Sequence, residues 1–182
     1  MISRSQVIIL CEDLNHYHFA RALLIEYGVK PRKIVQVLNQ GAQGSGEGFV
    51  RERLPLEVKA FRSRASKVAL TLFVITDADN KSVEERKRQL DSELRGQTHP
   101  RGEGEKILYI IPRRNIETWF YYLDNDAADE EANYKNHYRN AKPSHHGRQL
   151  AKRCKEGALD NPPPSLSIAC EEWRRVSAIG GR

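Results

Sequence analysis

Residues 68–76, with the sequence VALTLFVIT, form a run of nine residues without a charged side chain and with several β-branched ones. Such a run is typical of a parallel strand in the middle of a sheet, buried on both faces. Shorter apolar runs occur at 7–11, 34–38 and 107–111. The segments between the four runs contain 22, 29 and 30 residues, which is long enough for helical crossovers between parallel strands. The pattern predicts an α/β fold with one mostly parallel sheet and helices on both of its faces.

Local signals predict where several helices begin. Asn15 is a candidate N-cap for a first helix, and Pro55 fits the first turn of a second helix. Ser82, followed three residues later by Glu85, has the spacing of a capping box and opens a third helix. The segment 41–48 contains four glycines and is predicted to be a loop at the rim of the strand ends.

The chain of 182 residues suits one domain, but its character changes after the fourth apolar run. Beyond that run the sequence predicts helices at 115–123 and 165–176 and no further strand. We assign residues 1–123 to a Rossmann-like α/β domain. Residues 124–182 are assigned to a basic, mostly helical C-terminal extension that packs on the same domain.

The net charge of +6 is concentrated in the last fifty residues. Residues 1–132 carry 20 Lys and Arg against 20 Asp and Glu, whereas residues 133–182 carry 10 against 4. A basic segment beside a neutral core suits a polyanionic partner such as nucleic acid. A solvated helical surface has the same composition, so the charge by itself leaves both interpretations open.

Acidic residues directly follow the first and third predicted strands. Glu12 and Asp13 follow the first strand, and Asp77 and Asp79 follow the third. The carboxyl ends of parallel strands meet at one edge of the sheet, where sites form in such folds. Mg²⁺ or Mn²⁺ prefers oxygen ligands, so the four carboxylates predict a divalent metal site. The alternative is that Glu12 and Asp13 cap a helix while Asp77 and Asp79 lie in a solvated turn.

A glutamate that ends the first strand and Asp-x-Asp at the end of the third resemble the signature of the Toprim family. That family includes primases, topoisomerases, OLD-family nucleases and small ribonucleases. The matching residues are Glu12 in VIILCED and Asp77 and Asp79 in FVITDADN, and the resemblance covers residues 5–120. It implies a Toprim-like fold with Glu12 as general acid or base and both aspartates at a catalytic Mg²⁺ or Mn²⁺. The family usually has glycine where this chain has Asp13.

A second pattern follows the fourth strand, in the segment IPRRNIETWF at 111–120. It resembles the Pro-x-x-x-Ile-Glu-x-Trp segment of small standalone Toprim-like proteins of bacterial defence and mobile elements. Arg113 and Arg114 leave the sheet at the edge that carries the carboxylates, where they are candidates for phosphate contact. Glu117 is a candidate metal-side carboxylate or an ion-pair partner for an arginine. Lys81 is a candidate contact to the scissile phosphate or an ordinary surface lysine.

The resemblance implies a metal-dependent nuclease that hydrolyses DNA or RNA, in the setting of bacterial anti-phage defence or a toxin system. Its implied partner is nucleic acid, and it allows a partner protein such as an ATPase. Two other classes of function stay open. One is a non-catalytic Toprim-like interaction module of a larger complex. The other is a receiver-like signalling domain phosphorylated at Asp77, although such domains generally need a lysine after a fifth strand.

Composition predicts the compartment. No apolar run approaches the roughly 20 residues of a membrane-spanning helix, and the run 7–11 is too short for a signal peptide. Cys11, Cys154 and Cys170 have no spacing typical of a metal site, so we expect reduced thiols. The sequence therefore predicts a cytoplasmic protein without a membrane partner.

Overall fold

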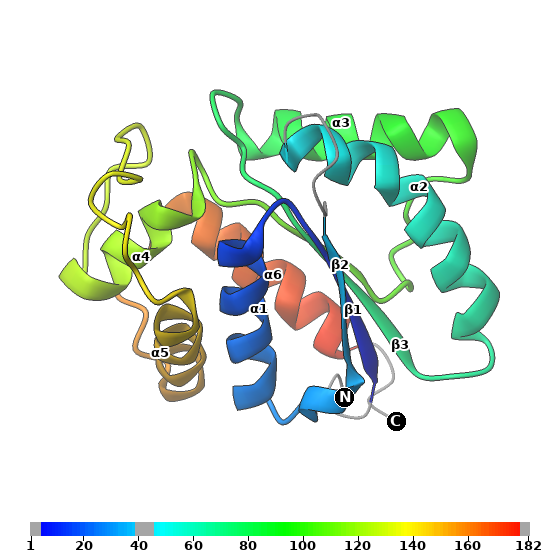
Figure 1. Cartoon of the computed structure of the whole chain (residues 1–182), viewed down its shortest axis with the longest axis horizontal. Helices are drawn as coiled ribbons and strands as arrows, with labels where there is room; N and C mark the ends of the chain where they lie inside the picture. Colours follow the sequence, from blue (N-terminus) through cyan, green and yellow to red (C-terminus); the bar gives the residue numbers. More distant parts are fainter. Residues whose placement is uncertain (1–4, 39–45, 179–182) are drawn as a thin grey trace.

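The computed structural model describes residues 5–38 and 46–178 and contains one four-stranded sheet. The strands are β1 (Gln6–Cys11), β2 (Ile34–Leu38), β3 (Leu70–Ile75) and β4 (Ile107–Ile110). Their order in the sheet is β2-β1-β3-β4, and every neighbouring pair is parallel. The predicted parallel α/β architecture is therefore confirmed (Figure 1).

Helices cover both faces of the sheet (Figure 1). One face carries α1 (Leu14–Glu26) and α6 (Pro164–Ala178), and the other carries α2 (Gly46–Ala65) and α3 (Val83–Gln97). On the same side as α1 lie α4 (Ile116–Asn125) and α5 (Pro143–Glu156). The short 3-10 helix η2 (Pro31–Lys33) leads into β2. Both faces of the central strands are thus shielded from water.

Alternation along the strands divides the apolar side chains between two cores. Val7 and Ile9 of β1 face the core that contains α1, α4, α5 and α6, whereas Ile8 and Leu10 face the core that contains α2 and α3. The first core holds most of the aromatic side chains, namely Phe19, Phe73, Trp119, Phe120 and Tyr122. The second core consists mainly of Val, Leu and Ile.

The apolar run 68–76 occupies the centre of the sheet, as predicted, but the strand is shorter than the run. All six residues of β3 are buried between β1 and β4. Val68 lies in the bend before the strand and is 46% exposed. After the strand, the backbone N–H of Thr76 still donates to Ile110 O at 3.2 Å. The chain then leaves the sheet with Asp77.

The first helix begins earlier than predicted. Asp13, and not Asn15, is the N-cap of α1, because its carboxylate accepts the backbone N–H of His16 at 3.0 Å. Aspartate is among the preferred residues at this position because it satisfies an amide that has no partner inside the helix. Asp13 therefore has a structural partner in addition to its candidate role as a metal ligand.

The prediction for the second helix is wrong at its start. Pro55 lies inside α2, which begins at Gly46. Proline lacks the N–H that a helix interior needs, and the burial of Leu54 and Val58 in the second core offsets that loss. Of the predicted glycine loop 41–48, residues 41–45 lie outside the described residues, and 46–48 are helical.

Other predicted elements match the structure. Ser82 and Glu85 form the capping box of α3, with the Glu85 N–H donating to Ser82 Oγ at 3.1 Å and the Ser82 N–H to Glu85 Oε2 at 2.7 Å. The helices predicted at 115–123 and 165–176 correspond to α4 and α6. Among the described helices, none has the length and apolar character needed to cross a bilayer.

Candidate functional site

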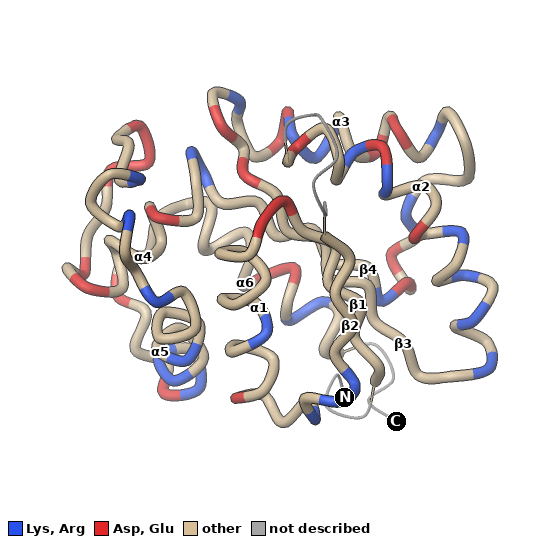
Figure 2. Tube along the Cα trace, viewed as in Figure 1, with Lys and Arg blue, Asp and Glu red and all other residues tan. Residues whose placement is uncertain are grey.

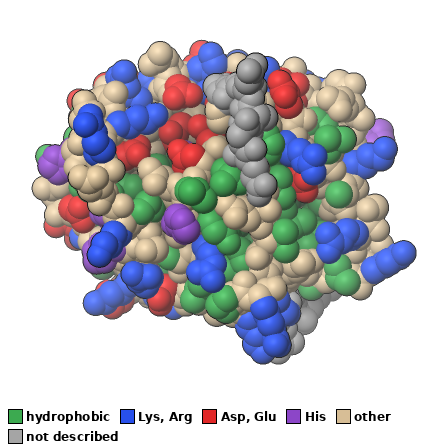
Figure 3. Space-filling model, in the orientation of Figure 1, with side chains coloured by type: hydrophobic (Ala, Val, Ile, Leu, Met, Phe, Trp, Pro, Cys, Tyr) green, Lys and Arg blue, Asp and Glu red, His purple; other side chains and the backbone are tan. Residues whose placement is uncertain are grey.

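The carboxyl ends of β1 and β3 lie side by side in the middle of the sheet. The chain leaves β1 toward the β2 edge and leaves β3 toward the β4 edge, so the connections diverge between these two strands. Ligands of open parallel sheets bind at such a topological switch point. Figure 2 shows acidic positions above these strand ends, and Figure 3 shows acidic side chains there bordered by Lys and Arg.

Glu12 reaches across from the end of β1 to the end of β3. Its Oε1 accepts the backbone N–H of Asp77 at 2.7 Å and also the hydroxyl of Thr76. Burial and the nearby charge of Asp77 raise the pKa of Glu12 to about 7. A carboxyl group with such a pKa exchanges a proton readily near neutral pH. Gly46, at the start of α2, lies so close that a Cβ there would stand 2.8 Å from the Cβ of Glu12.

His16 is a fully buried imidazole between two aspartates. Its Nε2 lies 2.9 Å from Asp77 Oδ1, and its Nδ1 lies 2.9 Å from Asp13 Oδ1. Burial alone would lower the pKa of His16, but the charge of Asp77 and the hydrogen bonds to both aspartates raise it well above its usual range. Because an ionised carboxylate only accepts hydrogen bonds, both ring nitrogens carry protons in this arrangement.

Asp13 is the second carboxylate partner of His16. Partial desolvation of the Asp13 side chain, which is still 57% exposed, opposes its ionisation, but the hydrogen bond and the charge of His16 outweigh this and lower the pKa of Asp13 to about 2. The carboxylate also keeps its bond to the backbone of α1. Asp13 is therefore held as an anion that orients His16.

Asp79 turns toward a second buried cation, Arg86. The residue has a left-handed backbone (φ 54°), and its N–H donates to Arg114 O at 2.8 Å. Arg86 is 2% exposed, and its Nη2 donates to Asp79 Oδ2 at 3.0 Å while its Nε donates to Asp77 O at 3.0 Å. Its Nη1 pairs with Glu47 of α2. Arg86 thus joins α2, α3 and the turn after β3.

Glu117 lies on the first turn of α4. It is 7% exposed, and its Oε2 has no hydrogen-bond partner in the described part of the chain. Burial, together with the charge of Asp77, raises the pKa of Glu117, and the charges of His16 and Lys135 only partly oppose this. The Oδ1 of the adjacent Asn115 is likewise without a partner among the described residues. Two buried oxygens at the start of α4 therefore lack hydrogen-bond donors.

The predicted phosphate-contacting residues lie on the border of this site. Arg113 Nη2 donates to both carboxylate oxygens of Glu131, at 2.9 and 3.1 Å, and Arg114 Nη1 donates to Glu131 O at 2.8 Å. The backbone N–H of Lys81 donates to Ala78 O at 3.0 Å, which places Lys81 next to the Asp-x-Asp turn. Both arginines hold the segment after α4 in this conformation.

No three His, Cys, Asp or Glu side chains of residues 5–38 and 46–178 form a ready metal-binding group. Asp77 faces His16, and Asp79 faces Arg86. The type of donor nevertheless fits a hard divalent cation, because Glu12, Asp77 and Glu117 offer only carboxylate oxygens. A cation bound to the buried Oε2 of Glu117 would compensate a charge that has no partner among the described residues.

Sequence reasoning placed the acidic residues at one edge but missed His16, Arg86 and Glu47. The spacing Asp13-x-x-His16 was the available signal, because an N-cap carboxylate lies beside the side chain three residues later. Comparisons of the chain with protein-family models, curated proteins and solved structures gave no match. The functional argument therefore depends on the geometry of the strand ends.

Proposed function

We propose that this chain is a Toprim-like, Mg²⁺- or Mn²⁺-dependent nuclease that hydrolyses phosphodiester bonds of DNA or RNA in the cytoplasm. The observation that carries the proposal is the contact between Glu12 and the backbone of Asp77 at 2.7 Å. It brings two acidic residues from separate strands together at the switch point of a parallel sheet. An anti-phage defence or toxin role fits the resemblance in segment 111–120.

Each acidic residue has a proposed role. Glu12 transfers a proton, which suits a carboxyl group with a pKa of about 7. Asp77 and Glu117 hold the metal, with Asp79 joining them after release from Arg86. A bound Mg²⁺ supplies charge stabilisation for a phosphoryl group and activation of a water molecule. Arg113, Arg114, Lys81 and the basic segment 133–182 are proposed to contact the phosphate backbone, alone or with a partner protein such as an ATPase.

One observation favours the alternative of a non-catalytic Toprim-like interaction module. Asp77 and Asp79 both have cationic partners inside the fold, as they would in a purely structural network. The receiver-like alternative is weakened, because Asp77 is only 3% exposed and hydrogen-bonded to His16. A phosphorylation site needs a more accessible carboxylate.

Cleavage of labelled DNA and RNA, with and without Mg²⁺ or Mn²⁺, tests the proposal directly. We expect metal-dependent cleavage that falls by at least about a thousandfold in Asp77→Asn and Glu12→Gln. Glu84→Gln, at an exposed carboxylate on α3, is the matched control and should cleave normally. Cleavage that survives in Asp77→Asn would contradict the proposal. If the wild type cleaves neither DNA nor RNA, with or without metal, the interaction module is favoured.

Binding assays across a salt series test the phosphate contacts separately. We expect affinity to fall as salt rises, because neutralised phosphates release counterions. Arg113→Ala with Arg114→Ala should weaken binding to all sequences alike, since contacts to phosphates do not read bases. Arg88→Ala, at an exposed position on α3, is the control. Binding that does not depend on salt would contradict this part of the proposal.

A further inference from the structure

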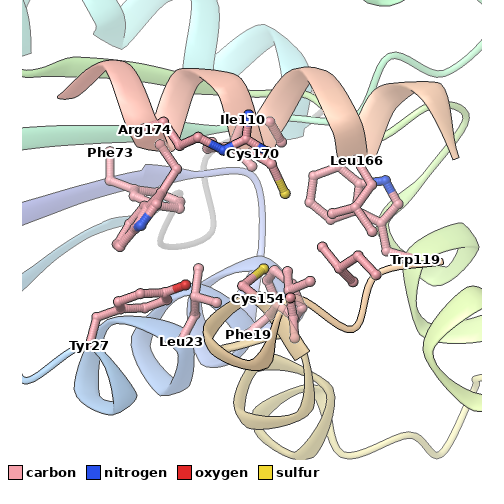
Figure 4. Close-up of a pocket in the computed structure, with 15 residues that line it drawn as sticks. Phe19, Leu23, Tyr27, Phe73, Ile110, Trp119, Cys154, Leu166, Cys170 and Arg174 are labelled. Carbon is pink, nitrogen blue, oxygen red and sulfur yellow. The ribbon is translucent and has the colours of Figure 1, made fainter. Parts of the chain in front are cut away.

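A cavity of about 290 Å³ lies between α1, α5 and α6 on the face of the sheet opposite α2 and α3. Figure 4 shows the side chains around it. Most of the lining is apolar and comes from residues such as Phe19, Leu23, Phe73 and Leu166. Arg174, an exposed residue of α6, also lines it, so the cavity reaches the surface. None of the described residues that line it belongs to the acidic site.

Two cysteines from different helices line this cavity. Cys154 belongs to α5 and Cys170 to α6, and Figure 4 shows their sulfur atoms directed toward each other. The two thiols are close enough to affect each other's ionisation, and neither residue is fully buried. Their positions in the sequence gave no sign of this contact, which arises only when α6 packs across the cavity.

The surroundings make the two thiols unequal. The neighbouring thiol of Cys170 lowers the pKa of Cys154, and the Tyr27 hydroxyl and the charge of Arg174 act in the same direction against burial. The same contact raises the pKa of Cys170. Cys11 is different from both, because burial raises its pKa to about 12 and it lies in β1. A more acidic thiol beside a second thiol is the arrangement that oxidants attack selectively.

We infer that Cys154 and Cys170 form a redox-active dithiol, a modification site at which a peroxide that enters the cavity converts the pair to a disulfide. The Cys154 thiolate attacks one peroxide oxygen, the O–O bond breaks, and a sulfenic acid and hydroxide form. The Cys170 thiol then attacks this sulfur, the S–O bond breaks, and water leaves. The two cysteines together lose two electrons, which reduce the peroxide.

The disulfide would fasten α5 to α6 on the outside of the first core. These helices are joined by the segment 157–163, which contains Gly157 with φ 66° and Asn161 with φ 42°. A covalent bond across that segment restricts the unfolded chain. Oxidation is therefore expected to raise the melting temperature of the full chain, by about 6–12 °C if a loop of this length has its usual effect.

The experiment is peroxide treatment of the full native chain, followed by acid trapping and mass spectrometry of peptides. We expect a linked Cys154–Cys170 peptide that has lost the mass of two hydrogen atoms, and its reversal by a dithiol reductant. Cys11→Ala, the matched control, should still form the link. Cys170→Ser should stop at a sulfenic acid on Cys154, which dimedone traps. Disulfides between chains, or oxidation of Cys11 before the pair, would overturn the inference.

A second measurement needs no substitution, so it is independent of any folding defect in the variants. Phenylarsine oxide bridges two neighbouring thiols, and its ring suits the apolar cavity. We expect one molecule to bind per native chain and prior peroxide treatment to prevent binding. Failure of the untreated wild type to bind the arsenical would show that the two thiols are not available together.

Discussion

The two sides of the carboxyl edge neutralise their acidic residues in different ways. The His16 side consists of Asp13, His16, Asp77 and Glu117, and the Arg86 side consists of Glu47, Asp79 and Arg86. Each side has one fully buried cation that contacts an aspartate, at 2.9 Å for His16 and 3.0 Å for Arg86. Arg86 keeps its charge at any ordinary pH and presents five donors in a fixed plane. His16 has two donors, and an imidazole can lose its charge.

The difference shows which side is prepared for a ligand. On the Arg86 side, the guanidinium bonds to Asp79, Glu47, Gln89 and the carbonyl of Asp77, so the network is complete. On the His16 side, Glu117 keeps an oxygen without a partner among the described residues. A buried hydrogen-bond network with an unpaired polar group costs stability unless a ligand pairs with that group. The Arg86 side is therefore interpreted as a structural lock of the metal-free protein, from which Asp79 is released when a cation enters on the His16 side.

The largest effect is expected from removal of the lock. Arg86→Leu should reduce the free energy of unfolding by about 3–5 kcal/mol, because two carboxylates lose the cation that compensates them. Urea unfolding followed by circular dichroism measures the change. Arg88→Leu, two residues away on the exposed face of α3, should change stability by less than about 0.5 kcal/mol. Equal effects of the two substitutions would remove the basis of the comparison.

A smaller loss is expected on the other side. His16→Gln should destabilise the protein by about 2 kcal/mol, since glutamine gives Asp77 at best one uncharged hydrogen bond. Adding Asp77→Asn should recover part of the loss, because the unpaired charge disappears. The matched control is His18→Gln, at an exposed position of the same helix. If the double variant shows simple additivity, His16 and Asp77 are not coupled as the 2.9 Å contact indicates.

Glu117→Gln should stabilise the metal-free protein by roughly 1 kcal/mol, since it removes a buried charge that lacks a partner. The pKa of Glu117 is raised in the folded state, mainly by burial. A raised carboxyl pKa means that the wild type loses stability as pH rises above the unfolded value of about 4.3. The advantage of the variant should therefore appear only above that pH, in thermal unfolding scans at a series of pH values.

The same variant tests the metal. Mg²⁺ should raise the melting temperature of the wild type, because a ligand that binds only the native state stabilises it. This rise should be lost in Glu117→Gln and kept in the control Glu84→Gln. A Mg²⁺-dependent rise of equal size in Glu117→Gln would show that Glu117 does not hold the cation.

Glu172 provides a reference for a fully compensated carboxylate. Glu172 of α6 bonds to Arg101 Nη1 at 2.6 Å, and the hydrogen bonds and charges of Arg101 and Arg175 outweigh burial and lower the pKa of Glu172. A lowered carboxyl pKa contributes stability that is present above about pH 4.3 and is lost as pH falls through the folded value. Glu172→Gln should lose about 1 kcal/mol at pH 7 and almost nothing at low pH.

Above about pH 4.3, Glu172→Gln should be less stable than the wild type, whereas Glu117→Gln should be more stable. Thermal unfolding of both variants in the same buffers gives the comparison without a second method. If both variants respond to pH in the same direction, the distinction between compensated and uncompensated carboxylates is wrong.

Much of the fold could be predicted from the sequence, because its main determinants are local. Buried parallel strands need continuous apolar runs, and the run at 68–76 identifies the central strand by composition alone. The start of α2 could not be predicted, since packing against the sheet overrides the usual effect of Pro55. The start of α1 depended on a choice between two residues that both cap helices well.

The site could be predicted only in part. Strand ends give the positions of Glu12 and Asp77, since parallel strands deliver these residues to one edge. They do not give the partners of the side chains. Arg86 looks like any polar residue of a helix, and its burial arises only from the packing of α2 against α3. The left-handed backbone of Asp79 turns its carboxylate toward Arg86, and no spacing in the sequence encodes that turn.

The close approach of Gly46 to Glu12 has a consequence for how sequences with this fold can change. A side chain at position 46 would meet the Cβ of Glu12 at 2.8 Å, and not the flexible end of that side chain. Any replacement of the glycine must therefore move the backbone at the end of β1. Position 46 is thus expected to remain glycine wherever the backbone at the end of β1 keeps its course, whichever residue with a Cβ stands at position 12.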